Sequence, residues 1–247
     1  MTDTLLTPTR PVVEAARSAP CLHCHPPATP SSFYDRRRPL LAGLGLAFVL
    51  LAAAAALAGG WLALRWDLPI ARFAIAHRSD TLDTFFRSAS RLGSTVVVLG
   101  LSAVLVLVTW SRCRAVALAI AVAALTRPLI EFVLKDAVDR PRPSLSRLVV
   151  GTGPSFPSGH VMAAVALYGL LPLVVGLFTR NRVVWWASAA VSGVLIVTIA
   201  ASRVYLGVHW FSDVVGSMLL GSFFLLAVEA IHRSLHRSMP HEHSCPP

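Results

Sequence analysis

Long apolar runs alternate with short polar stretches along most of the chain. A helix needs about 20 apolar residues to cross roughly 30 Å of hydrocarbon. Such runs are helices, because a strand exposed to lipid leaves its backbone hydrogen bonds unsatisfied. Six segments are long enough: 40–64, 94–110, 115–134, 161–178, 183–201 and 212–231. The pattern predicts an all-α, polytopic membrane helical bundle with six transmembrane helices.

Arginines in the short flanks of these segments predict the orientation of the chain. Cytoplasmic loops of membrane proteins carry an excess of Lys and Arg. With six crossings, four groups of arginines fall on one side: Arg36, Arg37 and Arg38; Arg112 and Arg114; Arg180 and Arg182; Arg233 and Arg237. We expect both termini to be cytoplasmic. The loops 65–93, 135–160 and 202–211 then face outward.

The polar ends of the chain set the expected domain boundaries. Residues 1–39 are Pro-rich and lack helical periodicity, which is typical of a disordered cytoplasmic tail. We expect one six-helix membrane domain over 40–231 and a His-rich cytoplasmic tail over 232–247.

An amphipathic stretch, 78–93, precedes the second apolar segment. Its apolar side chains recur at helical spacing opposite its charged ones, which favours a helix lying in the membrane interface. A loop helix packed on the bundle explains the pattern equally well. The apolar positions are Leu82, Phe85, Phe86, Ala89 and Leu92.

Composition supports a membrane protein and argues against a nucleic-acid-binding one. Hydrophobic residues make up 55% of the chain and charged residues 14%, although the formal net charge is +10. The mean hydropathy is +0.66. A soluble domain of this size carries far more charge on its surface. So apolar a chain leaves little room for a basic groove, and we expect the bilayer to be its environment.

The first polar cluster with chemical potential follows the third segment. Lys135 is the only lysine among 22 basic residues, so a compact ammonium group is favoured at this position. Taken alone, Lys135 is better explained as a lysine that snorkels from a helix end. Pro141 and Pro143 end the helix and stiffen the loop that carries Arg140 and Arg142.

Charged residues also occur within the third segment. Arg127, Glu131 and Lys135 are spaced by four, so they share one helix face. Charges inside membrane segments are usually paired and often functional. We expect Glu131 to support Lys135 or Arg127 beside the site. We also expect Arg140, in the loop, to lie beside the site. A purely structural ion pair is an equally good interpretation.

The second cluster, Pro157-Ser158-Gly159-His160, opens the fourth segment. Pro suits a helix start and Ser is a good cap. Free N–H groups and the helix dipole make such an end an anion site, and Gly159 lets an anion approach the backbone. His160 in the first turn can give a proton to a departing oxygen. Without the other clusters, this is only a capped helix.

The third cluster is Ser202-Arg203, His209 and Asp213. His209 and Asp213 are four residues apart, so on a helix a carboxylate could accept the imidazole Nδ1–H and leave Nε2 as a nucleophile. Asp213 is costly at the start of a membrane helix unless it is paired. Arg203 supplies a planar, charged group suited to phosphate oxygens.

Together, the clusters resemble the three-part signature of the type 2 phosphatidic acid phosphatases. The matching residues are Lys135-x6-Arg142-Pro143, Pro157-Ser158-Gly159-His160 and Ser202-Arg203-x5-His209-x3-Asp213. That family is similar in its site to vanadium haloperoxidases and some bacterial acid phosphatases. The resemblance covers roughly 65–231. One departure is Ser217, where the family often has Gly.

The resemblance implies a role for each matching residue. His209 would attack phosphorus, Asp213 would orient it, and His160 would protonate the leaving oxygen and later activate water. The phosphate oxygens would be held by Lys135, Arg142, Ser158, Gly159 and Arg203. The family works without a metal or other cofactor, and we expect the same here.

The resemblance and the helix ends at the outer boundary predict a lipid phosphate phosphatase of the plasma membrane, acting on its extracytoplasmic side through a phosphohistidine. Expected substrates are polyprenyl diphosphate, phosphatidylglycerol phosphate or phosphatidate. A lipid phosphotransferase and a non-catalytic membrane protein are the alternatives. The oligomeric state is left open, as is metal binding by the tail residues Cys21, His23, Cys24 and His25.

Overall fold

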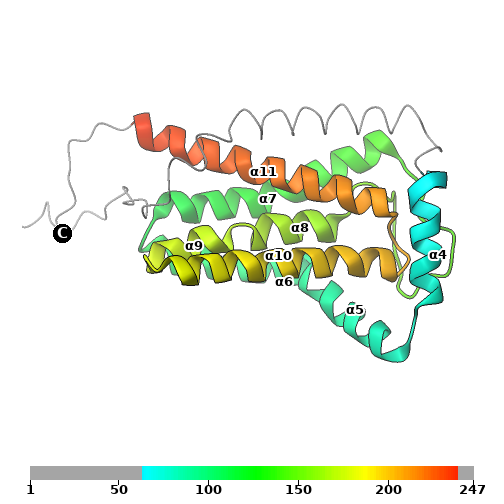
Figure 1. Ribbon diagram of the computed structural model, residues 1–247. Helices are drawn as coiled ribbons and strands as arrows, with labels where there is room; N and C mark the ends of the chain where they lie inside the picture. The colour runs from blue at the N-terminus through cyan, green and yellow to red at the C-terminus, as the bar shows by residue number, and fades with distance from the viewer. Residues whose placement is uncertain (1–62, 239–247) are drawn as a thin grey trace, which may run out of the picture.

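The computed structural model describes residues 63–238 (Figure 1). These residues form helices and connecting loops and contain no strand, which confirms the all-α class for this part of the chain. Parts of three predicted segments lie outside the described residues. These are the whole tail 1–39, all but the last two residues of the span 40–64, and the end of the tail 232–247. The elements, in order, are η2 Ala63–Asp67, α4 Leu68–Ala76, α5 Asp80–Leu92, α6 Thr95–Trp110, α7 Arg114–Val138, α8 Gly159–Tyr168, α9 Leu171–Phe178, α10 Arg182–Tyr205 and α11 Phe211–Ser238.

Three stretches of helix are long and apolar enough to cross a membrane: Val116–Val138, Gly159–Phe178 and Arg182–Tyr205. The pair α5 and α6 is a fourth candidate, bent by 47° at the break between the two helices. The apolar part of α11, Phe211–Phe223, is shorter. The described residues therefore belong to a multi-pass membrane protein. Six crossings and cytoplasmic termini stay predictions.

The predicted continuous segment 161–178 is two helices, with a break between α8 and α9. Pro172 has no N–H and its ring clashes with the carbonyl group four residues earlier, so the helix cannot run through it regularly. At the break, Leu170 N–H donates to Leu167 O at 3.2 Å in a tighter turn. Gly169 faces Leu225 of α11 so closely that a Cβ there would overlap the leucine side chain.

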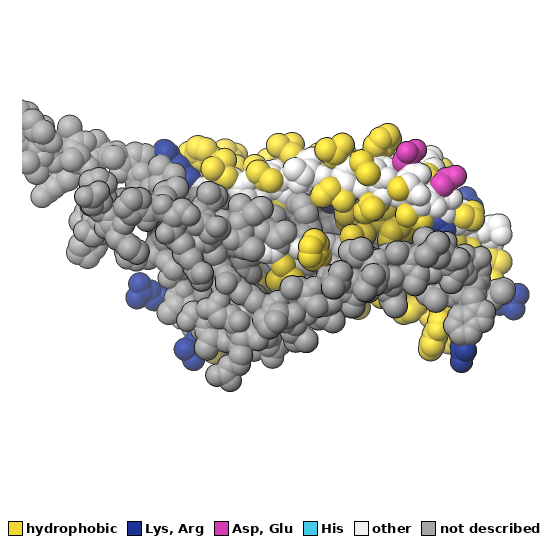
Figure 2. Space-filling model, turned by 90° about the horizontal axis from the view of Figure 1, so that it is seen from above, with side chains coloured by type: hydrophobic (Ala, Val, Ile, Leu, Met, Phe, Trp, Pro, Cys, Tyr) yellow, Lys and Arg dark blue, Asp and Glu magenta, His cyan; other side chains and the backbone are white. Residues whose placement is uncertain are grey.

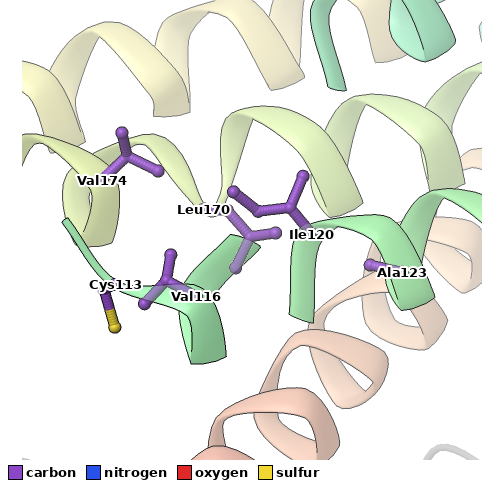
Figure 3. Close-up of a cluster of buried hydrophobic side chains, with 6 residues drawn as sticks. All are labelled: Cys113, Val116, Ile120, Ala123, Leu170 and Val174. Carbon is purple, nitrogen blue, oxygen red and sulfur yellow. The ribbon is translucent and has the colours of Figure 1, made fainter. Parts of the chain in front are cut away.

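A buried apolar cluster joins α7 to the α8–α9 break. Val116, Ile120 and Ala123 of α7 lie against Leu170 and Val174 (Figure 3). Their spacing of three and four residues puts the α7 members on one helix face. This contact fixes α7 beside α8, and so sets the relative positions of the two helix ends that carry site residues.

The flanks of the bundle are strongly apolar. Figure 2 shows hydrophobic side chains along the visible flank and basic side chains near the ends of the molecule. Large apolar side chains that are half or more exposed include Val122, Leu125 and Phe132 of α7 and Trp186 and Val194 of α10. Exposed apolar surface of this extent marks contact with another apolar phase, here the lipid.

The amphipathic stretch is helix α5, and it packs on the bundle as one of its two interpretations expects, while a position in the membrane interface stays a prediction. Phe86 packs on Tyr205 of α10 with ring centroids 4.3 Å apart, and Ala89 is buried, so one side of α5 lies on the bundle. Phe85 and Leu82 are exposed. Ser79 caps the helix by accepting a hydrogen bond from Leu82 N–H at 3.4 Å.

The polar clusters meet at one end of the bundle. Helices α7 and α10 end there, and α8 and α11 begin there, next to α4 (Figure 1). The α9–α10 connection and the start of α7, with their arginines, lie at the other end. Antiparallel packing thus brings together residues that lie far apart in the sequence.

Candidate active site

His209 lies in the short loop between α10 and α11 and its side chain is 3% exposed. Nδ1 is 2.7 Å from the carbonyl oxygen of Ser155, which can only accept a hydrogen bond. Nε2 is 3.3 Å from Nη1 of Arg142, which can only donate. Both contacts require the neutral tautomer with hydrogen on Nδ1. Nε2 therefore carries a lone pair, as a nucleophile requires.

Asp213, in the first turn of α11, is fully buried and saturated with donors. Its Oδ1 accepts from Arg140, and its Oδ2 accepts from the Ser155 hydroxyl and from Trp210 N–H at 2.9 Å. His209 Nδ1 is 3.8 Å from Oδ2, beyond hydrogen-bond distance. The predicted Asp213–imidazole hydrogen bond is thus replaced by one to the Ser155 carbonyl. Asp213 acts on the ring through its charge and through Ser155.

The environment of His209 favours its neutral form. Burial lowers the pKa of His209 below its ordinary value of 6.5, and the positive charges of Arg203 and Arg142 lower it further, while Asp213 raises it. The net direction is downward. The imidazole therefore keeps its lone pair at neutral pH.

Two guanidinium groups near His209 have no acidic partner among the described residues. Arg203 of α10 is 6% exposed. Its Nη1 donates to the Ser90 hydroxyl, and its Nε is buried with no hydrogen-bond partner in the described part of the chain. Arg142 is held by three backbone carbonyl groups, those of Gly153, Thr152 and Val208. Buried positive charge without a counter-ion is costly, and an anion bound between these groups would offset that cost.

The start of α8 offers further donors. Ser158 occupies the N-cap position, as predicted, but its side chain makes no capping hydrogen bond, and its buried hydroxyl has no partner within residues 63–238. Its backbone N–H instead donates to the Ser217 hydroxyl at 2.7 Å. Ser217 donates onward to Asp213 O at 2.6 Å. The loop before α8 is thereby tied to the first turns of α11.

The charged residues of α7 form one linked set. Glu131 accepts from Arg127 and from Lys135, each at 2.7 Å, so it pairs with both of its predicted partners. Arg127 also donates to Gly159 O at 3.2 Å. A Cβ on Gly159 would overlap the Glu131 carboxylate. This set fixes the end of α7 against the start of α8.

His160, in the first turn of α8, is partly exposed, and its side chain makes no hydrogen bond with the described residues. It is near enough to Arg203, His209 and Lys135 to interact with them electrostatically. All the predicted site residues therefore lie around the same end of the bundle. Their individual roles stay predictions.

The sequence prediction did not identify three residues of this region. Ser155 holds both His209 and Asp213, yet a lone Ser in a Gly- and Pro-rich loop carries no distinctive signal. Ser90 contacts Arg203 from α5. Asp67 is fully buried and bonds to Arg140. One signal was available for Asp67: it is an acidic residue close to a predicted membrane segment, where a charge is costly unless it is paired.

Metal ligands are not grouped in this region. Among residues 63–238, no set of three His, Cys, Asp or Glu side chains is placed to hold a metal ion. The tail residues Cys21, His23, Cys24 and His25 lie outside the described part.

Comparisons with known proteins identify relatives of this chain. Phosphatidylglycerophosphatase B of Bacillus subtilis (strain 168) is 29% identical over 182 residues, covering 69% of this chain and 85% of the relative. The crystal structure of a transmembrane PAP2-type phosphatidylglycerolphosphate phosphatase from Bacillus subtilis matches with a TM-score of 0.70 and 27% identity, covering 81% of this chain and 98% of that one. Aquifex aeolicus LpxE shares the fold, with a TM-score of 0.52 and 24% identity over 66% of this chain and 94% of its own. Residues 114–237 match the model of the PAP2 superfamily, and the chain belongs to that family.

Proposed function

We propose that this protein is a membrane phosphatase that hydrolyses a lipid-linked phosphate or diphosphate through a phosphohistidine on His209. The observation that carries the proposal is the state of the His209 ring. Its Nδ1 is held by the Ser155 carbonyl and its Nε2 keeps a lone pair beside guanidinium groups that lack acidic partners. A neutral nucleophile next to an anion site is the arrangement that phosphoryl transfer requires.

The positive groups around the ring fit a phosphoryl group. Arg203, Arg142 and Lys135 would stabilise the charge on the equatorial oxygens as it redistributes in the transition state. The unpartnered Ser158 hydroxyl and the free N–H groups at the start of α8 would add hydrogen bonds. Cationic side chains would thereby supply the electrostatic stabilisation that a bound metal gives elsewhere.

The two histidines divide the proton transfers. Nε2 of His209 would attack phosphorus while the bond from phosphorus to the lipid oxygen breaks, and protonated His160 would give that oxygen its proton. A bound phosphate dianion favours the protonated form of His160. Neutral His160 would then take a proton from water, whose oxygen attacks phosphorus and breaks the bond to Nε2. Both imidazoles return to their starting states.

The position of the site favours a lipid substrate. It lies where candidate membrane spans end, so a phosphate anchored by a lipid tail would reach it without leaving the bilayer. The two Bacillus subtilis relatives named above are phosphatases of phosphatidylglycerol phosphate. We therefore infer a substrate among phosphatidylglycerol phosphate, phosphatidate and polyprenyl diphosphate. Arg112, Arg114, Arg180 and Arg182 lie at the opposite end, and this supports an extracytoplasmic site.

The activity is tested with the full chain in detergent, in the presence of EDTA, on those three lipids. Phosphate release that vanadate inhibits is the expected result, because vanadate mimics five-coordinate phosphorus. Hydrolysis that appears only on addition of a metal would overturn the mechanism. Lipid dephosphorylation that exceeds phosphate release when an acceptor alcohol is added would favour the transferase.

The side of the membrane is tested by labelling in cells with an impermeant maleimide. In a variant without native cysteines, Ser144→Cys lies at the site end and Arg180→Cys at the other, and both positions are exposed. We expect immediate labelling at 144 and labelling at 180 only after permeabilisation. The reverse pattern would place the site in the cytoplasm.

A further inference from the structure

Asp67, at the junction of η2 and α4, has a fully buried carboxylate. It occupies the N-cap position of α4, where an aspartate usually accepts hydrogen bonds from its own helix. Its side chain makes no such bond. An ionised carboxylate is buried only at a high cost in free energy unless it is paired, so its partners indicate its role.

Among the described residues, the hydrogen-bond partners of Asp67 all belong to the active-site end of the bundle. Oδ1 accepts from Ser212 N–H at 2.8 Å. Oδ2 accepts from the Ser212 hydroxyl and from Arg140 Nη2, each at 2.6 Å. Ser212 lies in the first turn of α11, whose N–H groups have no partner within the helix. Asp67 therefore holds the start of the helix that carries Asp213.

Arg140 connects the two buried carboxylates. Its Nη2 pairs with Asp67, and its Nη1 contacts Asp213 and donates to the Ser212 hydroxyl at 2.8 Å. Asp213 in turn receives the Ser155 hydroxyl, and Ser155 supplies the carbonyl oxygen for His209 Nδ1. A continuous series of hydrogen bonds thus runs from Asp67 to the imidazole.

We propose that Asp67 is a positioning residue for the nucleophile, acting through Arg140 and Ser212 on Asp213. When the carboxylate of Asp67 is removed, Arg140 Nη2 loses its acceptor and the first turn of α11 loses its anchor. Asp213, Ser155 and the ring would then be free to shift. Displacement of a reacting group by about 1 Å can lower a rate about a hundredfold. Among the described residues, Asp67 makes no bond to the proposed phosphate-binding groups, so substrate binding is unaffected.

The inference rests on the proposed phosphatase activity and is tested in single turnovers. The full-length Asp67→Asn variant in detergent is mixed with a smaller amount of radiolabelled phosphatidylglycerol phosphate, so that the enzyme is in excess. If the wild type hydrolyses another of the three lipids, that lipid is used instead. Samples are stopped at alkaline pH, where phosphohistidine survives. At enzyme concentrations high enough to saturate the lipid, the rate constant of phosphohistidine formation does not depend on the fraction of folded enzyme. We expect it to fall about tenfold to a hundredfold with KM within about twofold of the wild type.

Asp136→Asn is the matched control, because it removes the same charge from an exposed position on α7. It should leave the rate constant unchanged. An unchanged rate constant in Asp67→Asn, or a KM that rises as steeply as the rate constant falls, would overturn the inference. Absence of phosphate release by the wild type would instead sink the proposed function, so the two failures are distinct.

A double-mutant cycle tests the route through Arg140. Residues that act through one network have non-additive effects. In the Arg140→Gln background Asp67 has already lost its guanidinium partner and keeps only Ser212, so adding Asp67→Asn should lower the rate constant by clearly less than it does in the wild type. Full additivity of the two effects would show that Asp67 does not act through Arg140.

Discussion

His209 and Ser155 are joined by a hydrogen bond of 2.7 Å from Nδ1 to the backbone carbonyl oxygen. A carbonyl oxygen cannot take up the proton, so this contact fixes the tautomer and the direction of Nε2 whatever the ionisation of nearby acids. Asp213, 3.8 Å from Nδ1, is left to supply negative charge to the ring. Orientation and electrostatic support therefore come from two different residues.

His209→Ala tests the assignment of the nucleophile. The variant has no nitrogen to attack phosphorus, so kcat should fall by at least about 10³-fold. No labelled phosphohistidine should form in alkaline-quenched samples. His77→Ala removes an exposed histidine at the end of α4 and should retain wild-type turnover. Multiple-turnover hydrolysis by His209→Ala at more than about a thousandth of the wild-type kcat would show that another group attacks.

The ionisation of His209 gives a prediction on pH. Because burial and two arginines outweigh Asp213, the ring should titrate with a midpoint below 6.5. Protonation consumes the Nε2 lone pair, so activity persists above this midpoint and is lost as pH falls through it. NMR titration of histidine-labelled protein measures the midpoint, with His209 assigned from the spectrum of His209→Asn. A midpoint at or above 6.5 would contradict this account.

The sequence predicted the family, and the residues that it proposed for the site lie at one end of the bundle because each motif marks a helix end. Apolar length identified the spans in α7 and α10, and Ser158 was correctly placed at the start of α8. The break between α8 and α9 was not predicted, since hydropathy does not register that Pro172 interrupts backbone hydrogen bonds. The number of crossings was argued from the length of the apolar segments and the orientation from the positions of the arginines, and both are still predictions.

The contacts that hold the site were harder to predict than its residues. Asp67 and Arg140 are far apart in the sequence, and no local pattern predicts that they meet. The Ser155 carbonyl is a backbone group, so residue type carries no information about it. Spacing of four between His209 and Asp213 suggested a direct hydrogen bond, but His209 lies in the loop before α11. The helical geometry behind that argument did not apply.

Ser217→Ala tests the link between α11 and the loop before α8. The variant leaves the buried Ser158 N–H without its acceptor, at a cost of about 1–3 kcal/mol. We expect a lower unfolding temperature and a KM raised severalfold, because Ser158 belongs to the proposed phosphate site. Ser192→Ala is the control: that buried hydroxyl has no hydrogen-bond partner within residues 63–238, so its loss should be neutral or stabilising. Equal effects of the two variants would refute a specific role for Ser217.

Substitutions of Glu131 and Lys135 should have different effects: the first should lower stability, and the second should weaken substrate binding. The Arg127 side chain is 4% exposed, so Glu131→Gln leaves a buried guanidinium unpaired at a cost of about 3 kcal/mol or more. Lys135→Ala removes a partly exposed amine and keeps the Arg127–Glu131 pair. It should change stability little but raise KM about tenfold or more. Unfolding in SDS and steady-state kinetics measure the two effects, and the idea fails if Lys135→Ala is the less stable variant.

Gly159→Ala should damage the site without disturbing the helix that it begins. Its Cβ would overlap the Glu131 carboxylate, which must then move away from Lys135 and Arg127. We expect kcat/KM to fall about tenfold to a hundredfold. Gly193→Ala is the matched control, because a Cβ there meets nothing within 4 Å in the middle of α10. Alanine is also the better helix former, so this variant should be as active as the wild type and more stable by up to about 1 kcal/mol. If both variants keep full activity, the close approach of Glu131 to the start of α8 has no part in catalysis.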